Sequence, residues 1–286
     1  MKPVFISIIP AVIFSIISCT KQGGEISVPI SFSAGVPIFA STKAPVDNID
    51  DLEPIYILRS EGEADYTSLT APTLTGTINS EGVVTPSELQ FYAHDGTSVN
   101  FMAFYPQANS IGSGIANFII TGQEDIMAAQ SVYGGWIGSK KTVDFVFTHK
   151  LAQIQFFVKA ESSQAASSWG TLTYLKINTP SSMDLTLITA ALDTNTNAQW
   201  TDLPTSIGDN ASQTLTTTAT SAGGLMLLTV AYPLTVKVKT SNIEEHDVII
   251  GLYYMLPGNI YTITLTFKGS GTGIPITASL TGWSAG

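Results

Sequence analysis

The chain has 286 residues, of which 44% are hydrophobic and only 12% are charged. This composition excludes an intrinsically disordered chain, whose signature is low hydrophobicity with high net charge. The formal net charge is −10, with 12 lysines and arginines against 22 acidic residues. Because nucleic-acid backbones are bound by clustered cations, a nucleic-acid partner is all but excluded.

The N-terminus has the features of a secretory signal peptide. One cation, Lys2, precedes an uncharged apolar run at residues 4–17, which is shorter than the roughly 20 residues that a membrane-spanning helix needs. A charged start, a short apolar stretch and small residues after it describe a signal sequence that is removed from the mature protein. Residues 1–18 are therefore predicted to lie outside the fold.

Residues 16–19, with the sequence IISC, resemble a bacterial lipobox, and Cys19 is the only cysteine of the chain. A secreted protein that used disulfides would carry an even number of cysteines, so Cys19 is better explained as a lipid attachment site. Acyl chains such as palmitate on Cys19 would anchor the protein stably. Because Thr20 rather than Asp follows, the outer membrane is the expected location. The alternative is an ordinary signal peptide that happens to contain Cys19.

Alternating apolar and polar residues predict strands throughout the mature chain, with the period of two typical of half-buried strands. Pro29 lies in the first of them and cannot donate to a ladder, which suggests an edge position or weak pairing on one side. Helical patterns are confined to residues 124–130 and 162–168, each long enough for a turn or two. The predicted strands are 26–34, 54–58, 99–105, 172–177 and a closing hairpin of 261–267 with 274–280.

The apolar alternation changes phase between residues 143 and 158. Odd-numbered residues from Val143 to Leu151 share one parity, and His149 continues their apolar series, whereas even-numbered residues from Ile154 to Val158 share the other. A β-bulge, one extra residue near 152–153, would return both sets to a single core.

The sequence predicts an all-β protein with two sandwich domains. Many short strands with frequent turns are typical of that fold class. Glycines and lysines at 134–141 suggest a boundary, because on each side a long alternating strand is followed by a polar stretch and a second strand. The predicted domains are residues 19–140 and 141–286.

No catalytic, cofactor-binding or metal-binding residues are predicted. His149 is expected in a core, bonded to backbone, and His94 in a turn before Gly96. His246 stands among three carboxylates at 244–247, but neighbours on a strand point to opposite faces, so a solvated turn is favoured over a cation site. No GxSxG, HExxH or CxxC motif occurs. Three tryptophans could bind carbohydrate if they are exposed: Trp136, Trp169 and Trp200. The alternative is that they pack in the core or within the strands.

Several segments together resemble the fimbrillin (Mfa-like) family of type V pilus subunits and related surface lipoproteins. Residues 143–154 (VDFVFTHKLAQI) are similar to the family's F-x-F-x-H-x-L-A-x-L strand. Residues 99–106 (VNFMAFYP) are similar to a second family strand, with the pattern v-x-F-x-A-Y-Y-P. Residues 124–129 (EDIMAA) resemble the family segment that precedes the domain junction. Residues 256–261 (LPGNIY) resemble the family segment before the closing hairpin, and Trp283 matches the tryptophan of the family's last strand. The matches occur in family order and span most of the mature chain.

The resemblance implies two tandem transthyretin-like β-sandwich domains and no cofactor. In pilus-forming members, a lipidated precursor reaches the outer membrane and a protease cuts after a basic residue that follows the first strand. Losing that first strand opens an apolar groove, which a C-terminal strand from the next fimbrillin subunit then fills. This chain offers Lys43, with Ala44 as the new N-terminus, where the family commonly has Arg.

The expected function is that of a non-enzymatic surface lipoprotein of the outer membrane or fimbrium, an adhesin or pilus subunit with a host or glycan ligand. Only three residues follow the closing strand at about Trp283, whereas a donor strand needs roughly five or more. This predicts a tip or accessory subunit. The alternative is a stand-alone glycan-binding lipoprotein. A glycan hydrolase is a third hypothesis, but it would need two carboxylates in one cleft.

Overall fold

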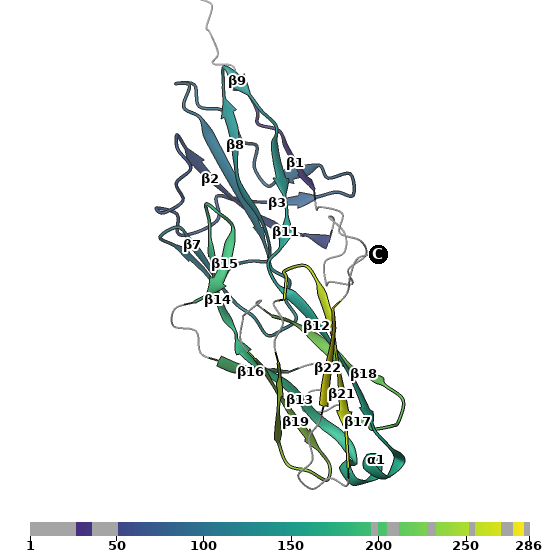
Figure 1. Ribbon diagram of the computed structural model, residues 1–286. Helices are drawn as coiled ribbons and strands as arrows, with labels where there is room; N and C mark the ends of the chain where they lie inside the picture. The colour runs from purple at the N-terminus through teal and green to yellow at the C-terminus, as the bar shows by residue number, and fades with distance from the viewer. Residues whose placement is uncertain are drawn as a thin grey trace, which may run out of the picture.

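The structure is a computed structural model that describes residues 27–35, 51–195, 200–204, 212–227, 233–251, 255–269 and 277–282. Strands make up 56% of it, and the described residues contain one short helix. The all-β prediction is confirmed. Figure 1 shows an elongated molecule, with the sheets of the first half gathered at one end and most sheets of the second half at the other.

A seven-stranded sheet organises the first half. Its order is β11-β8-β5-β2-β3-β4, with β9 paired to β8. The predicted strands at 54–58 and 99–105 are confirmed as β2 and β5. Both faces of β5 are buried, because this part of the sheet is covered on both sides. The strands are β2 (Ile55–Glu61), β3 (Leu74–Ile78), β4 (Val84–Pro86), β5 (Val99–Tyr105), β8 (Met127–Trp136), β9 (Ser139–Lys140) and β11 (Thr148–His149).

One face of this sheet packs against a two-stranded parallel ribbon of β1 (Phe32–Gly35) and β10 (Val143–Val146). Together they enclose a cluster of buried apolar side chains that includes Phe32, Phe101, Phe145 and Phe147, which we call the first core. The aromatic rings make contact directly: Phe32 lies edge-on to Phe101 at 5.0 Å between ring centroids. The first core therefore depends on β1, although 107 residues separate β1 from β10.

Two sheets form the other end of the molecule. Their orders are β18-β12-β21-β22 and β16-β13-β19-β20, with β17 on β13, and the predicted closing hairpin is confirmed as the antiparallel pair β21–β22. The predicted strand at 172–177 is confirmed within β13. The strands are β12 (Ala152–Ala160), β13 (Thr171–Pro180), β16 (Trp200–Pro204), β17 (Gln213–Thr214), β18 (Thr220–Leu227), β19 (Leu234–Thr240), β20 (His246–Ile250), β21 (Ile260–Phe267) and β22 (Thr277–Gly282).

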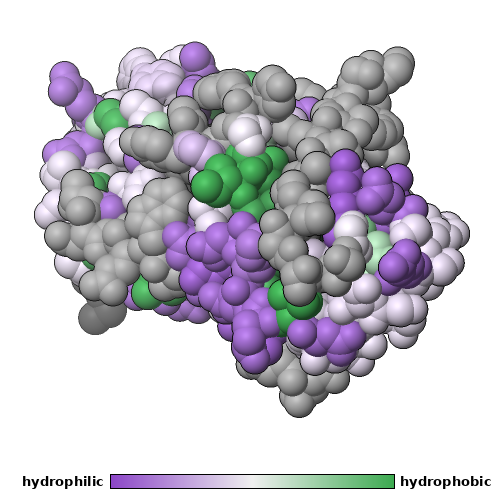
Figure 2. All heavy atoms as spheres, turned by 60° about the horizontal axis from the view of Figure 1, so that its bottom comes forward, coloured by the Kyte–Doolittle hydropathy of each residue, from purple (hydrophilic) through white to green (hydrophobic). Residues whose placement is uncertain are grey.

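One of the two predicted helical turns is confirmed. Helix α1 (Ser163–Trp169) starts after Ser162, whose side chain accepts a hydrogen bond from the Ala165 amide and so satisfies a donor at the helix start. The other prediction, at 124–130, is wrong, because Met127 already begins β8. Figure 2, turned so that the end with α1 comes forward, shows hydrophobic residues in separate patches, the largest near the centre of the view and next to hydrophilic residues.

A four-stranded antiparallel sheet joins the two halves. Strands β14 (Ser182–Thr186) and β15 (Ala191–Thr194) extend a hairpin of β6 (Ser110–Gly112) and β7 (Ile115–Ile119), with β14 paired to β7 along five residues. On its outer face, the Asn117 amide donates to Asp184 Oδ1 at 2.9 Å and to the Met183 carbonyl at 3.1 Å. Its inner face contributes Phe118 and Leu185 to a second core, which runs from Leu58 in the first sheet to Phe267 in the last.

The change of phase after residue 143 is a passage between cores, and the predicted bulge at 152–153 is wrong. Val143, Phe145 and Phe147 lie in the first core, whereas Leu151 and Ile154 lie in the second. Residues 134–141, expected at a domain boundary, span the turn of the β8–β9 hairpin. The division into domains at 19–140 and 141–286 stays a prediction.

Candidate assembly site

The N-terminal strand is inserted between two partners. On one side β1 pairs with β10 in parallel, and the Val143 amide donates to the Ser31 carbonyl at 2.9 Å. On the other side, segment 82–92 accepts two hydrogen bonds, from Ile30 N to Gln90 O and from Ala34 N to Gly82 O, each 2.8 Å. Pro29 makes only an isolated bridge with this segment, as expected of a residue without an amide hydrogen. We call the space that β1 fills the β1 slot.

The side chains of β1 and of the residues just before it divide between the slot and solvent. Ile30, Phe32 and Ala34 are 6%, 6% and 9% exposed, so the predicted alternation is confirmed over these residues. Ser33 points outward and donates from Oγ to Asp144 Oδ1 at 2.9 Å. The slot thus holds an apolar residue, an aromatic residue and a small residue at alternate positions of one strand.

The slot is narrow where it receives Ala34. Gly82 has φ +78, a conformation that side chains rarely adopt, and a Cβ atom there would collide with the Ala34 carbonyl oxygen. Sequence reasoning missed segment 82–92 as a partner of β1, because the pairing joins residues about 50 positions apart and the segment lacks a long alternation. The one local signal is the Asn79–Gly82 turn, where the Gly82 amide donates to the Asn79 carbonyl.

A buried pair lies where the two cores meet. His149 Nδ1 is 2.8 Å from Asp125 Oδ2, and the two side chains are 5% and 1% exposed. The expected burial of His149 is confirmed, but the expected backbone partner is wrong, since the partner is a carboxylate. Gly258, with φ +74, lies against the ring, and its amide donates to the Leu151 carbonyl at 2.8 Å. Three of the segments noted above, at 124–129, 143–154 and 256–261, therefore meet at one point.

The other histidines lie on the surface. His246 is exposed, and two of its acidic neighbours pair with lysines: Glu244 with Lys239 at 2.8 Å and Glu245 with Lys237 at 3.7 Å. His94 lies in the predicted turn, next to Asp95, which accepts from the Thr97 amide at 2.8 Å. No cluster of three His, Cys, Asp or Glu side chains that could hold a metal ion occurs among the described residues.

The tryptophans differ in exposure. Trp169 is 3% exposed, donates from Nε1 to the Lys268 carbonyl at 3.1 Å and lies edge-on to Phe267, so it belongs to the core. Trp136 is 41% exposed at the end of β8. The side chain of Trp200 lies outside what the structure describes, as do Cys19, Lys43 and Ala44. Within the described part of the chain, no helix has the length and apolarity needed to cross a membrane.

The fold is shared with bacterial proteins of known structure. A proposed cell adhesion protein of Bacteroides uniformis ATCC 8492 matches with a TM-score of 0.59 and 18% identity over 90% of this chain and 99% of that one. A proposed cell adhesion protein of Bacteroides ovatus ATCC 8483 matches with 0.55 and 14% over 90% and 98%. A fimbrial assembly protein of Parabacteroides distasonis ATCC 8503 matches with 0.50 and 12% over 90% and 99%.

These neighbours show that the chain shares the β-sheet fold of those three proteins. The fimbrillin-like (Mfa-like) family profile matches residues 42–283, and the chain belongs to this family. No curated protein matches the sequence. Family membership points to a structural, non-enzymatic protein of the cell surface that assembles with other fimbrial subunits.

Proposed function

We propose that the chain is a lipid-anchored tip or accessory subunit of a fimbrium and that it is assembled by strand exchange in the β1 slot. The observation that carries this proposal is the burial of Ile30, Phe32 and Ala34 between β10 and segment 82–92. A strand held in this way is bound by main-chain hydrogen bonds and by side chains in pockets, which are the elements of strand addition. A strand of the same alternation from another subunit can replace it.

Loss of β1 would leave an apolar groove open to water. Burying a Phe or Ile side chain contributes about 1.5–3 kcal/mol, and Phe32 packs against both Phe101 and Phe145. The exposed groove is therefore a strong driving force for capturing an incoming strand. Because a register shift of one residue would point that strand's apolar side chains outward, the groove also selects the register.

Cleavage after Lys43 would remove the anchor and β1 together. Cys19, the predicted lipid site, precedes β1 in the chain, and Lys43 follows it. Polar, proline-ended segments such as residues 40–45 are common sites of proteolysis. The cut would leave Ala44 as the new N-terminus and release the subunit from its outer-membrane anchor once another strand has taken the slot.

The closing strand supports a terminal position in the fibre. Strand β22 pairs with β21 from Tyr261↔Gly282 to Thr266↔Thr277, so it completes its own sheet. Donating it would remove an established strand and open that sheet. A subunit that accepts a strand without donating one occupies a tip or accessory place.

A peptide exchange experiment tests this function. The chain is cut after Lys43 while folded, and a labelled peptide of residues 27–35 is added. We expect the peptide to replace β1 one to one by native mass spectrometry, and a Phe32→Asp peptide to fail. The complex should stay monomeric. A cut protein that ignores the peptide would contradict strand exchange, and ladders of SDS-resistant multimers would contradict the tip position.

A second candidate function is that of a stand-alone glycan-binding lipoprotein, and the exposure of Trp136 is the observation that favours it. Its ring lies against the backbone of Gly138, where no side chain competes for space. An aromatic ring held in this way offers a face for a sugar. A glycan array separates the candidates: binding that is lost in Trp136→Ala, by a surface form that keeps its anchor, would favour this function.

A further inference from the structure

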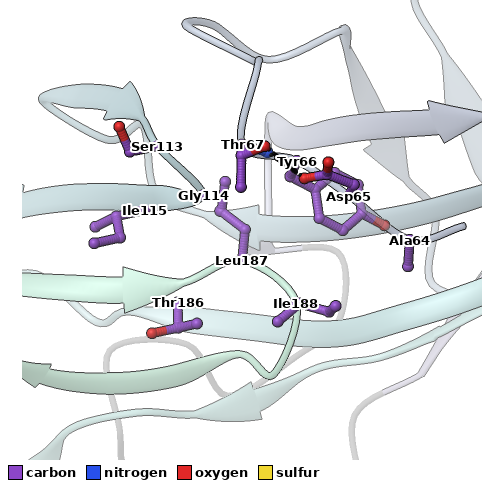
Figure 3. A pocket seen from close by; sticks show the side chains of 10 residues that line it. All are labelled: Ala64, Asp65, Tyr66, Thr67, Ser113, Gly114, Ile115, Thr186, Leu187 and Ile188. Carbon is purple, nitrogen blue, oxygen red and sulfur yellow. Dashed lines mark hydrogen bonds between the residues drawn. The ribbon is translucent and has the colours of Figure 1, made fainter.

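A surface pocket of about 310 Å³ lies where three segments from both halves of the chain meet. Figure 3 shows the segments around it: residues 64–67 after β2, residues 113–115 from the β6–β7 turn into β7, and residues 186–188 from the end of β14. The Leu187 amide donates to the Gly114 carbonyl at 2.9 Å and fixes the second and third segments to each other. The pocket exists only because β14 pairs with β7.

The pocket has an apolar floor and an apolar rim. Leu187 and Tyr66 form buried parts of the lining, at 0% and 2% exposure, while Ile115 and Ile188 remain 37% and 50% exposed at its edge. Ile119, 57% exposed, lies four residues along β7 on the same face as Ile115. Asn117 lies between these two isoleucines on that face, so Ile119 is a separate exposed apolar position beyond the pocket.

The charge at the rim is negative and held in place. Asp65 Oδ1 accepts hydrogen bonds from Thr67 N at 2.8 Å and Thr67 Oγ1 at 2.7 Å, which lower the pKa of Asp65 and keep it ionised in mild acid. Ser60 Oγ binds the same loop, donating to the Glu63 carbonyl and accepting from the Asp65 amide. None of the residues that line the pocket is a lysine or arginine.

We propose that this pocket receives a lysine or arginine side chain of a protein partner, with its aliphatic stem over Ile115 and Ile188 and its cation beside Asp65. Long basic side chains combine an apolar stem with a charged end, which matches this division of the rim. A carboxylate at the rim disfavours an anion. A sugar would lack a stacking surface, because the only aromatic residue of the lining, Tyr66, is buried. The inference does not depend on exchange of β1.

Isoleucine-methyl NMR of the full mature chain tests the proposal with two probes of equal shape. Nα-acetyl-lysine methylamide should shift the Ile115 and Ile188 methyl signals saturably, with a dissociation constant on the order of millimolar for so small a ligand. The Nα-acetyl methylamide of 2-aminoheptanoic acid, whose n-pentyl side chain has the length of the lysine side chain but no charge, should bind more weakly. Ile188→Thr should weaken both.

The matched control is provided by a second aspartate. Asp65→Asn keeps the oxygen that accepts from Thr67 but removes the charge, so it should fold and bind the lysine probe about two- to five-fold more weakly. Asp95→Asn makes the same change in the equivalent turn with Thr97, outside the lining of the pocket, and should have no effect. Equal binding of the two probes would show an apolar site without cation selectivity, and unmoved methyl signals would show no site; either result overturns the proposal.

Discussion

The imidazole of His149 is bonded to the carboxylate of Asp125 at 2.8 Å in the region where the two cores meet. The pair is almost entirely excluded from solvent, and Asp125 Oδ1 has no hydrogen-bond partner. Buried charged groups are tolerated when they are paired, and each becomes costly when its partner is removed. The pair ties the turn before β8 to β11, and the Gly258 loop covers it.

The first prediction concerns this pair. His149→Ala should lower the free energy of unfolding by about 3–5 kcal/mol, because it leaves the Asp125 carboxylate buried without a partner. The double variant His149→Leu with Asp125→Leu should be much less destabilised than the sum of the single variants. Urea unfolding measures both, with exposed His246→Gln as the control. Additive effects would show that the two residues do not act as a pair.

The second prediction concerns the β1 slot. Phe32→Ala should destabilise the protein by about 3–5 kcal/mol, since it leaves a cavity between Phe101 and Phe145. Hydrogen exchange should rise in β10, which pairs with β1, and little in β12. Ser31→Ala, at an exposed position of the same segment, should leave both measurements unchanged. If the amides of β10 kept their protection from hydrogen exchange in Phe32→Ala, the stability of the β1 slot would not depend on the Phe32 ring.

The third prediction separates the tryptophans. Trp169→Ala should cost about 3–5 kcal/mol because it removes a ring buried against Phe267, whereas Trp136→Ala should change stability by less than about 0.5 kcal/mol. Acrylamide should quench the fluorescence of Trp136 more readily than that of Trp169. An equal loss of stability in the two variants would mean that Trp136 also packs in a core.

The fourth prediction concerns acid. Burial alone would raise the pKa of Glu124, but hydrogen bonds from Thr121 and from the neighbouring amides outweigh it and lower the pKa below the usual 4.5. A lowered folded pKa contributes stability that is fully present above the unfolded pKa and is lost as pH falls through the folded value. Glu124→Gln should therefore flatten the stability profile below pH 4.5. A profile with the unchanged slope would contradict this account.

The strands could be predicted from the sequence, whereas their partners could not. Alternation located β2, β5, β13 and the closing hairpin, because half-buried strands repeat every two residues. It could not show that β1 lies between β10 and segment 82–92, since nothing local links residues so far apart. The phase change at 143–158 was visible, but a bulge and a passage between two cores produce the same pattern.

The chemistry of single side chains was predictable only in part. The apolar neighbours of His149 indicated burial, but Asp125 as its partner depends on tertiary contacts across 24 residues. The pattern at 124–130 suggested a helical turn, yet pairing of Met127 with Tyr105 and His149 places it in a sheet. Exposure of Trp136 and burial of Trp169 likewise follow from packing and not from local sequence.

The most direct test of the assembly proposal is the composition of the form found in fimbriae released from cells. N-terminal sequencing and intact mass should give a chain that begins at Ala44, lacks β1, and carries a strand of another fimbrillin subunit in the β1 slot. A surface form that begins at a lipid-modified Cys19, retains β1 and contains no second subunit would contradict strand exchange.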